Sequence, residues 1–514
     1  MNPITQKIYI EAEISISEHL ADREQLLAVV SDRIDRPVEI SYQNYKKFYT
    51  DCRESKWHFT VTVVDKRDRS EIIRIEQGNT TNQHYGLAVD LGSTTVVMEA
   101  VDLNTGKSLA KKSVVNGQIA FGTEILSRIF YTKGRPDHLE ELQQSIVDTF
   151  CGLLKVMESE TGIASENFSM MVVAGNTTMT HLLLGIDPWP IFEAPFIPFF
   201  NGMDFIAAVD LNIPINGVIY CIPSVANYLG GDILSGLLTT QMCESEAISL
   251  FIDIGTNGEM VLGSSDFMIA GAGAAGPALE GGVSQSGMRA EPGAIDHVDI
   301  VEGEVRYSVI GGEKPKGICG SGIVDLMSEM LLNGWIDFGG NFVEDATDKI
   351  IKIDKDYALV YADVEASANV GPLLFTQNDI CQYLDTKAAA NTMVTYLLEA
   401  AGIEMEAVDH LYIAGGFCEH IRLESAINIG LYPDISRDQV TVLGNSSLNG
   451  ARALLLNRDL FDQVIDFEKN IFYLEFGSAT DFLNRMFAAR FLPHTDLKQY
   501  PTVVKRLRER GIMK

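Results

Sequence analysis

Two short stretches of the sequence carry an acid from an apolar run directly into a glycine-rich turn. In GLAVDLGSTTVVMEA (86–100), Asp90 precedes the turn, and in FIDIGTNGEM (251–260), Asp253 does so. Glycines let a backbone take positive φ and approach a ligand closely. Successive N–H groups in such a turn attract anionic oxygens. Each turn is therefore a candidate phosphate-binding element.

The two acids predict a metal ion, because an aspartate repels a phosphate unless a cation lies between them. We interpret Asp90 and Asp253 as catalytic ligands of Mg²⁺, bound through waters because Mg²⁺ keeps part of its hydration shell. The residues expected to cradle the phosphates are Gly92, Ser93, Thr94 and Thr95 in the first turn and Gly255, Thr256, Asn257 and Gly258 in the second. A single such turn is weak evidence, since Asp-Gly-Thr is common in ordinary turns.

A third glycine segment has the chemistry of a nucleoside site. HLYIAGGFCEHI (410–421) runs an apolar strand into Gly415, Gly416 and Phe417 and then into a helical segment. Glycines at such a junction allow an adenine and its ribose to lie against the backbone. A tight strand-to-helix connection is the alternative interpretation.

Two further stretches have a functional and a structural interpretation each. In AGNTTMTHLLLG, Asn176 and Thr177 lie either beside the γ-phosphate or the attacking water, or at an ordinary helix N-cap. In GAGAAGPALEGG (271–282), Gly273 and Glu280 either contact the nucleotide, with Glu280 near the ribose, or belong to a close-packed helix crossing.

Length and composition limit the class of protein. A chain of 514 residues needs two to four domains, and its 46% hydrophobic and 21% charged residues are typical of a globular protein. The net charge of -30 disfavours nucleic acids and anionic membrane surfaces as partners. No apolar run approaches the ~18 residues of a membrane span, and the N-terminus lacks a secretion signal. We therefore expect a cytoplasmic protein without nucleic-acid or membrane partners.

The pattern along the chain predicts three domains. Residues 1–84 alternate like strands around a helical segment, which indicates a small α+β domain. Residues 85–246 and 247–514 each begin with an apolar strand that ends at an acid–glycine turn, followed by α/β patterning. This recurrence at one domain length predicts two related lobes.

Two facing phosphate turns and a nucleoside-binding glycine pair resemble the ATP cleft of the actin, sugar kinase and heat-shock chaperone superfamily. The resemblance implies an α/β fold with two ribonuclease H-like, actin-like lobes, an ATP cleft between them, and a preceding linker-type domain. The chain resembles one branch in particular, the reductive activators of corrinoid proteins. The stretches that carry this are NGQIAFGTEILSRI, VVAGNTTMTHLLLGIDP, EAPFIP, IPSVANYLGGDILSG, GAGAAGPALEGGVSQSGMRAEPGAI, GICGSGIVDL, FTQNDI, AGGFCEHI and FLPHTD.

That resemblance implies an ATPase that drives one electron into a Co(II) corrinoid and so regenerates the Co(I) form of a methyl-transfer protein. The implied cofactors are ATP and Mg²⁺, and the implied partner is the corrinoid protein of a methyltransferase system. Family members often form homodimers, so a homodimer is expected.

The sequence departs from the family in its cysteines. Typical members carry a [2Fe–2S] ferredoxin domain or [4Fe–4S] domains, whereas Cys52 stands alone in the first 150 residues and no cysteine follows Cys418. We therefore expect no iron–sulfur cluster and a separate low-potential electron donor, a ferredoxin or flavodoxin. Cys319 and Cys418 both lie in glycine turns, where they are either structural thiols or share a role.

Two alternative functions remain open. A small-molecule kinase of the same superfamily requires an acceptor pocket and a carboxylate base beside the γ-phosphate. A non-catalytic, ATP-gated binding module requires neither.

Overall fold

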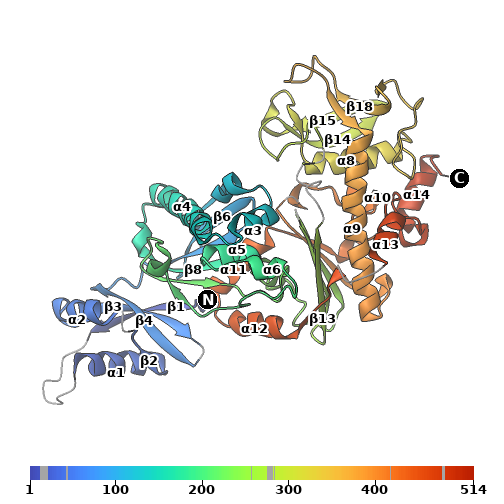
Figure 1. The fold of residues 1–514 in the computed structure, drawn as a ribbon. Helices are drawn as coiled ribbons and strands as arrows, with labels where there is room; N and C mark the ends of the chain where they lie inside the picture. The colour runs from blue at the N-terminus through green and yellow to red at the C-terminus, as the bar shows by residue number, and fades with distance from the viewer. Residues whose placement is uncertain are drawn as a thin grey trace. The chain divides into compact units, whose positions relative to one another are not determined.

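A computed structural model describes residues 1–11, 21–41, 44–66, 68–255, 257–274, 282, 284–416, 418–476 and 481–513. Three predicted site residues, Thr256, Glu280 and Phe417, lie outside this described part. The chain forms two compact units, which can be followed by colour in Figure 1. The first comprises Met1–Thr240 and Ser446–Asn470, and the second Gln241–Asn445 and Ile471–Lys514.

The first unit begins with a small α+β domain. Its four-stranded sheet has the order β1-β3-β4-β2. Alternating apolar residues of β3, such as Val61 and Val63, are buried in a core that also holds Trp57 and Phe59. The elements are β1 (Thr5–Glu11), α1 (Asp22–Ile34), β2 (Val38–Glu39), α2 (Tyr45–Glu54), β3 (His58–Lys66) and β4 (Arg69–Gln77).

The main sheet of the first unit has six strands in the order β7-β6-β5-β8-β10-β9. Strands β5, β6 and β7 are antiparallel neighbours, whereas β5, β8 and β10 run parallel. The strands are β5 (Tyr85–Leu91), β6 (Thr95–Asp102), β7 (Ser108–Val115), β8 (Phe168–Gly175), β9 (Ile206–Ala207) and β10 (Val218–Cys221). The helices are α3 (Ile125–Thr132), α4 (Pro136–Thr161), α5 (Thr177–Leu183), α6 (Trp189–Phe192), α7 (Gly231–Leu237), α11 (Ser446–Leu456) and α12 (Leu460–Asn470).

Helix α4 shows how local sequence sets an element. Pro136 occupies its first turn, where a missing N–H costs nothing. Gly162 ends it in the left-handed conformation at φ 70°, and its N–H bonds the carbonyl of Glu158. The helix packs Ile146, Phe150 and other apolar residues against the sheet.

The second unit is built on another six-stranded sheet, in the order β21-β20-β11-β12-β13-β22. Two three-stranded sheets, β15-β14-β16 and β17-β18-β19, accompany it. The strands are β11 (Ser249–Ile254), β12 (Asn257–Gly263), β13 (Met268–Ala274), β14 (Ala294–Val301), β15 (Glu304–Val309), β16 (Gly317–Ile318), β17 (Ile350–Ile353), β18 (Asp356–Ala362), β19 (Leu373–Thr376), β20 (His410–Ala414), β21 (Val440–Gly444) and β22 (Ile471–Tyr473). The helices are α8 (Gly320–Leu332), α9 (Gln377–Ala401), α10 (Leu423–Asn428), α13 (Phe482–Ala489) and α14 (Pro501–Glu509).

The two main sheets share one topology. In each, a strand ending at the acid–glycine turn pairs antiparallel with the next strand and parallel with a later one, so that β7-β6-β5-β8-β10 corresponds to β13-β12-β11-β20-β21. This confirms the repeat predicted from the sequence. None of the described helices combines the length and the apolar character needed to span a membrane.

A wholly buried lysine holds the end of the second unit together. Lys387 of α9 donates from Nζ to the carbonyl oxygens of Ala489, Phe491 and Pro493, at 2.7 Å for Phe491. Burial lowers the pKa of Lys387 to about 7. Its three donors match three carbonyls that the chain leaves unpaired after α13.

We predict that Lys387→Met destabilises the second unit, because it leaves these buried carbonyls without donors at a cost of about 1–3 kcal/mol or more. Differential scanning calorimetry should show a thermal midpoint lower by about 5 °C. Lys505→Met is the matched control, since the Lys505 side chain is 77% exposed. Equal midpoints for Lys387→Met and the parent protein would contradict the assignment.

Candidate functional site

The first acid–glycine turn connects β5 to β6. Each backbone carbonyl of residues 92–94 accepts a hydrogen bond from another part of the protein. Asn116 donates its side-chain amide to the carbonyl of Gly92 (2.9 Å) and its backbone N–H to that of Thr94 (2.9 Å). Arg128 donates from Nη2 to the carbonyl of Ser93 (2.6 Å). A Cβ on Gly92 would lie 2.5 Å from the carbonyl oxygen of Thr95, so this tight turn requires glycine.

The N–H groups of the same turn are available to an anion. No hydrogen bond within the described part of the chain uses the N–H of Gly92, Ser93 or Thr94 as its donor. With the carbonyls held by Asn116 and Arg128, these N–H groups form the polar surface that remains for a ligand. This is the arrangement expected of a phosphate cradle.

Arg128 adds a buried positive charge behind the turn. Its side chain lies on α3, is 0% exposed, and also donates to the carbonyl of Gly122 (2.9 Å) and to Oε1 of Gln118 (3.3 Å). Burial lowers the pKa of Arg128 to about 10. Among the described residues no carboxylate forms an ion pair with it, and a buried charge without a counter-charge is costly. An anion at the turn would compensate this charge.

Asp90 lies at the end of β5, partly buried, where two helices meet. Its Oδ1 accepts a hydrogen bond from the Ser447 hydroxyl at 3.0 Å. The Ser447 carbonyl in turn accepts from the Ser235 hydroxyl (2.6 Å). A Cβ on Gly450 would lie 1.8 Å from the carbonyl oxygen of Ser235, so α7 and α11 touch through their backbones. This contact fixes the start of α11 beside the acid.

A second carboxyl, Asp232, lies close to Asp90. It occupies the first turn of α7, and its Oδ1 accepts from the N–H of Ile233 at 2.9 Å. Burial, together with the negative charge of Asp90, raises the pKa of Asp232 to about 7. The two neighbouring carboxyls offer the hard oxygen donors that Mg²⁺ prefers.

Asn176 and Thr177 follow β8, the parallel neighbour of β5. The side-chain oxygen of Asn176 accepts from the N–H of Met179 (2.9 Å), which is the N-cap of the structural interpretation. The Thr177 hydroxyl is buried and donates to the carbonyl of Ala226 (2.7 Å). A Cβ on Gly230 would lie 2.3 Å from Cα of Asn176 and 2.8 Å from Oδ1 of Asp232, which places Asn176 near that carboxyl. Their role toward a phosphate stays a prediction.

In the second unit, Asp253 lies at the end of β11, next to the third glycine segment. The N–H of Gly255 donates to the carbonyl of Asn257 (2.8 Å), which closes the second turn. Gly415 follows β20, the parallel neighbour of β11, at φ 111°. A Cβ there would lie 3.1 Å from Oδ1 of Asp253. The second turn and the glycine pair are therefore adjacent at one edge of this sheet.

Of the remaining predicted glycines of the second unit, some lie within the sheet and one borders open space. Gly258 and Gly273 face each other across β12 and β13, and a Cβ on Gly273 would lie 2.7 Å from the sulfur of Met393 in α9. That contact packs strand β13 against helix α9, and the nucleotide contact of Gly273 stays a prediction. A Cβ on Gly416 would meet nothing within 4 Å, so this residue borders open space.

Cys319 and Cys418 have separate contacts. The Cys418 thiol donates to the carbonyl of Ala414 (2.9 Å) and lies 3.2 Å from the Tyr432 hydroxyl, whereas Cys319 donates to the carbonyl of Ile295 (3.3 Å). Burial raises the pKa of Cys418 to about 12. These contacts fit structural thiols. Within the described ranges, no group of three or more His, Cys, Asp or Glu side chains is arranged to hold a metal ion.

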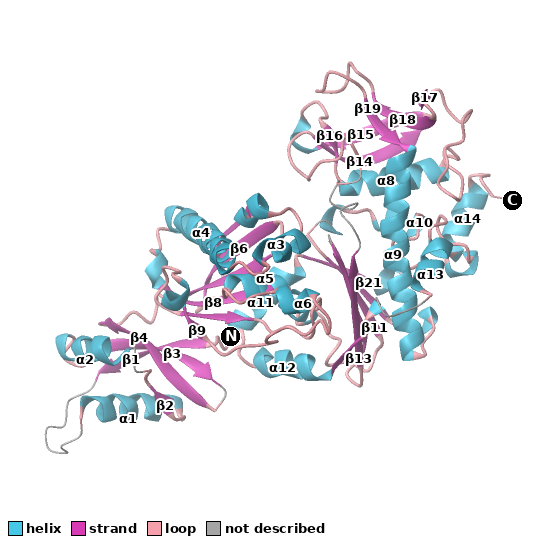
Figure 2. Ribbon diagram, viewed as in Figure 1, coloured by secondary structure: helices cyan, strands magenta, loops and turns pink. Residues whose placement is uncertain are grey.

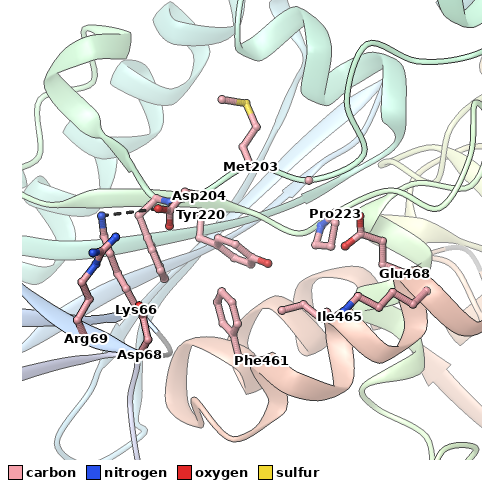
Figure 3. Close-up of a pocket in the computed structure, with 13 residues that line it drawn as sticks. Lys66, Asp68, Arg69, Met203, Asp204, Tyr220, Pro223, Phe461, Ile465 and Glu468 are labelled. Atoms are coloured by element: carbon pink, nitrogen blue, oxygen red, sulfur yellow. Dashed lines mark hydrogen bonds and ion pairs between the residues drawn. The ribbon is translucent and has the colours of Figure 1, made fainter. Parts of the chain in front are cut away.

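A cavity of about 420 Å³ also lies in the first unit, between the β3–β4 end, β10 and α12 (Figure 3). Tyr220 and Phe461 form its apolar wall, with ring centroids 4.7 Å apart. Two of the cations that line it form ion pairs, Lys66 with Glu71 at 2.7 Å and Arg69 with Glu39 at 3.2 Å. None of the predicted site residues lines it.

Comparisons with known proteins identify relatives over nearly the whole chain. Three sequence families match in order: the RACo linker region over residues 1–82, the RACo middle region over 85–245, and the C-terminal domain of RACo, the ASKHA domain, over 247–504. The solved structure of a reductive activator for corrinoid, iron-sulfur protein is 37% identical and covers 98% of this chain and 81% of its own, with a TM-score of 0.89.

Two further relatives are named for their action on corrinoid proteins. The corrinoid activation enzyme RamQ of Eubacterium limosum is 34% identical over 73% of this chain. The chain spans 65% of the length of RamQ. The [Co(II) methylated amine-specific corrinoid protein] reductase of Methanosarcina barkeri is 25% identical over 75% of this chain and 73% of its own length.

The repeated sheets, each with an acid at the end of its first strand, define an actin-like protein of the ASKHA class, as predicted. The chain belongs to the RACo family.

The raised pKa of Asp232 predicts a pH-dependent stability. A folded-state pKa of about 7, above the ordinary value of about 4, contributes stability at low pH that is lost as the pH rises through 7. Asp232→Asn removes this contribution and the repulsion from Asp90. The thermal midpoint of Asp232→Asn minus that of the parent protein should therefore increase as the pH is raised from 5 to 8.5. Both proteins are measured without Mg²⁺ or nucleotide.

Differential scanning fluorimetry across this pH range measures the effect. Asp210→Asn, at an exposed carboxyl of the same unit, is the matched control. If the difference in thermal midpoint between Asp232→Asn and the parent protein stays constant with pH, the raised pKa of Asp232 is contradicted.

Proposed function

We propose that this protein hydrolyses ATP and uses the energy to reduce the Co(II) form of a corrinoid protein to Co(I). The first turn is the observation that carries the ATP assignment. Its carbonyls accept hydrogen bonds from Asn116 and Arg128, whereas its N–H groups have no partner in the described structure. The buried positive charge of Arg128 lies behind it. The corrinoid assignment is supported by the likeness to the corrinoid activation enzyme RamQ and to the corrinoid protein reductase of Methanosarcina barkeri.

In this proposal both turns bind the phosphates of one ATP molecule. Asp90 and Asp253 hold Mg²⁺ through waters, and Gly415 and Gly416 accommodate the nucleoside. When bound, Mg²⁺ would neutralise the phosphate charge. Arg128 contributes a fixed positive charge that needs no rearrangement as negative charge develops, which is how preorganised sites stabilise a transition state.

Asp232 is the proposed proton acceptor. A general base works best when its pKa lies near the working pH, and the pKa of Asp232 is raised to about 7. Beside Asp90 and Asn176, it would orient the attacking water and take its proton. Asn176 and Thr177 then act mainly by fixing the first turn of α5 next to this carboxyl.

The hydrolysis serves an unfavourable electron transfer. Each ~59 mV of unfavourable one-electron potential costs a factor of ten in the equilibrium. ATP-driven closure or a change of cobalt coordination offsets that cost. We propose that the electron comes from a separate ferredoxin or flavodoxin, that this chain holds no iron–sulfur cluster, and that it acts in the cytoplasm as a homodimer. Iron determination, a visible spectrum and sedimentation test these points.

A small-molecule kinase is the second candidate, and Asp232 is the observation that favours it. The same carboxyl, with its pKa near neutrality beside the phosphate turn, would serve an acceptor hydroxyl as well as a water. The two functions differ in their product, which is a phosphorylated metabolite in the second case.

The test incubates the purified full chain with MgATP, a low-potential reductant and a Co(II) methylated-amine-specific corrinoid protein, and follows the cobalt absorbance. We predict ATP-dependent formation of Co(I). Asp90→Asn and Asp253→Asn should each lower ATP hydrolysis by about 100-fold, because each removes a carboxylate that positions the metal. Asp210→Asn should retain the parent rate.

Other outcomes point elsewhere. Hydrolysis that ignores every corrinoid protein contradicts the proposal, and ADP formed together with a phosphorylated metabolite favours the kinase. ATP binding without turnover leaves an ATP-gated binding module.

A further inference from the structure

Helix α11 lies along strand β5 and contacts both ends of it. Near the start of the helix, Ser447 donates to Asp90 at the end of the strand. Near the other end, Cδ1 of Leu455 lies 2.9 Å from the position that a Cβ on Gly86, at the start of β5, would take. The strand residues between these contacts span about 13 Å and the helix residues about 12 Å, so the helix runs antiparallel to the strand. Figure 2 shows α11 beside β8, the parallel neighbour of β5.

Polar contacts also hold the middle of α11. Arg452 forms an ion pair with Glu99 of β6, at 3.3 Å between Nε and Oε1. From Nη2 it donates to the carbonyl of Gly106 at 2.7 Å. Glu99 is 7% exposed, so this ion pair is largely shielded from water. The helix is therefore held along its length, and a rigid element of this kind can carry coupling between its two ends.

The last residue of α11 is joined to the segment before β1. The N–H of Asn2 donates to the carbonyl of Leu456 at 3.0 Å, and the N–H of Arg458 donates to the carbonyl of Asn2 at 2.7 Å. Leu456 ends α11, and the last four carbonyls of a helix have no partner within it. Asn2 supplies a partner for one of them. The start of the chain thus completes the end of this helix.

An ion pair makes a second connection between α11 and the small α+β domain of strands β1 to β4, here called the small domain. Asp65 of β3 has a side chain that is only 8% exposed, and its carboxylate pairs with both Arg36 and Arg458. Arg36 belongs to the small domain, whereas Arg458 follows the end of α11. Removing one partner of a shielded ion pair is costly, because it leaves the other charge uncompensated. The small domain therefore holds the end of α11 firmly.

We propose that the small domain orients the Asp90 carboxylate through α11, an inference that rests on the proposed function. Ser447, at the start of this helix, and Arg458, just after its end, are the positioning residues. When the small domain shifts, it carries the end of α11 with it, and the helix shifts the hydroxyl that holds Asp90. Coupling between two sites is reciprocal, so binding of a magnesium nucleotide also changes the hold on the small domain. The small domain thus regulates the ATP site.

The test measures, by isothermal titration calorimetry on the full chain, how strongly Mg²⁺ tightens the binding of ADP. The measured quantity is the Kd for ADP without Mg²⁺ divided by the Kd with Mg²⁺. Ser447→Ala should lower this ratio about tenfold, because the carboxylate loses the hydrogen bond that orients it. Arg458→Met should lower it about fivefold. The double variant should lie within about twofold of Ser447→Ala, since both changes act through the same hydrogen bond.

Hydrogen–deuterium exchange of the nucleotide-free chain is a second, independent measurement. Arg458→Met should raise the exchange of the backbone amides of residues 450–455, because α11 loses its hold on the small domain. Arg53→Met is the matched control, since Arg53 is 59% exposed and pairs with Asp22 within the small domain at 2.7 Å. It should leave both the ADP ratio and the exchange of α11 unchanged. Asp65→Asn weakens the same ion pair from the other side, and it replaces Arg458→Met if that variant does not fold.

Three results overturn the inference and leave the proposed function standing. In the first, Arg458→Met and Asp65→Asn keep the parent ratio while Ser447→Ala lowers it. In the second, the effects of Arg458→Met and Ser447→Ala multiply in the double variant, which assigns them to separate routes. In the third, Arg53→Met lowers the ratio as much as Arg458→Met does. If the parent chain binds ADP equally with and without Mg²⁺, the proposed magnesium site fails together with the inference.

Discussion

The first phosphate turn depends on a buried guanidinium, since Arg128 holds the carbonyls of Ser93 and Gly122. Arg128 donates to Ser93 and, together with Asn116, fixes every carbonyl of the turn after Asp90. This leaves a tight glycine turn whose N–H groups have no partner in the described structure and which is held by a buried guanidinium without a described counter-charge. A site of that kind is costly without an anion and favourable with one, so its stability and its function depend on the same interaction.

The acids on the other side of the turn complete the chemistry. Burial, and to a lesser degree the charge of the neighbouring Asp90, raises the pKa of Asp232 to about 7. In the proposed function, Asp90 holds the metal ion and Asp232 takes the proton. Ser447 fixes Asp90 from α11, a helix that returns to the first unit late in the chain. Helices α7 and α11 thus position the carboxyl groups, and the sheet positions the turn.

Local sequence patterns predicted much of the fold, but they did not predict the residues that hold the site residues in place. Apolar strands ending at Asp90 and Asp253 predicted the two sheets. Arg128, Asp232 and Ser447 were missed, because their roles arise from contacts between distant segments. One local feature could have indicated Arg128, namely a charged residue on the buried side of α3. Ser447 lies 357 residues from Asp90, so no local pattern connects the two. The sequence around Gly273 allowed either a nucleotide contact or close packing, and in the structure this glycine lies against Met393.

The most direct test of the central claim is a crystal structure of the full chain with Mg²⁺ and a non-hydrolysable ATP analogue. We predict phosphate oxygens within hydrogen-bonding distance of the N–H groups of residues 92–94, with the metal's water ligands on Asp90. A nucleotide whose phosphates lie away from this turn, with Arg128 still holding Ser93 as it does without ligand, would contradict it.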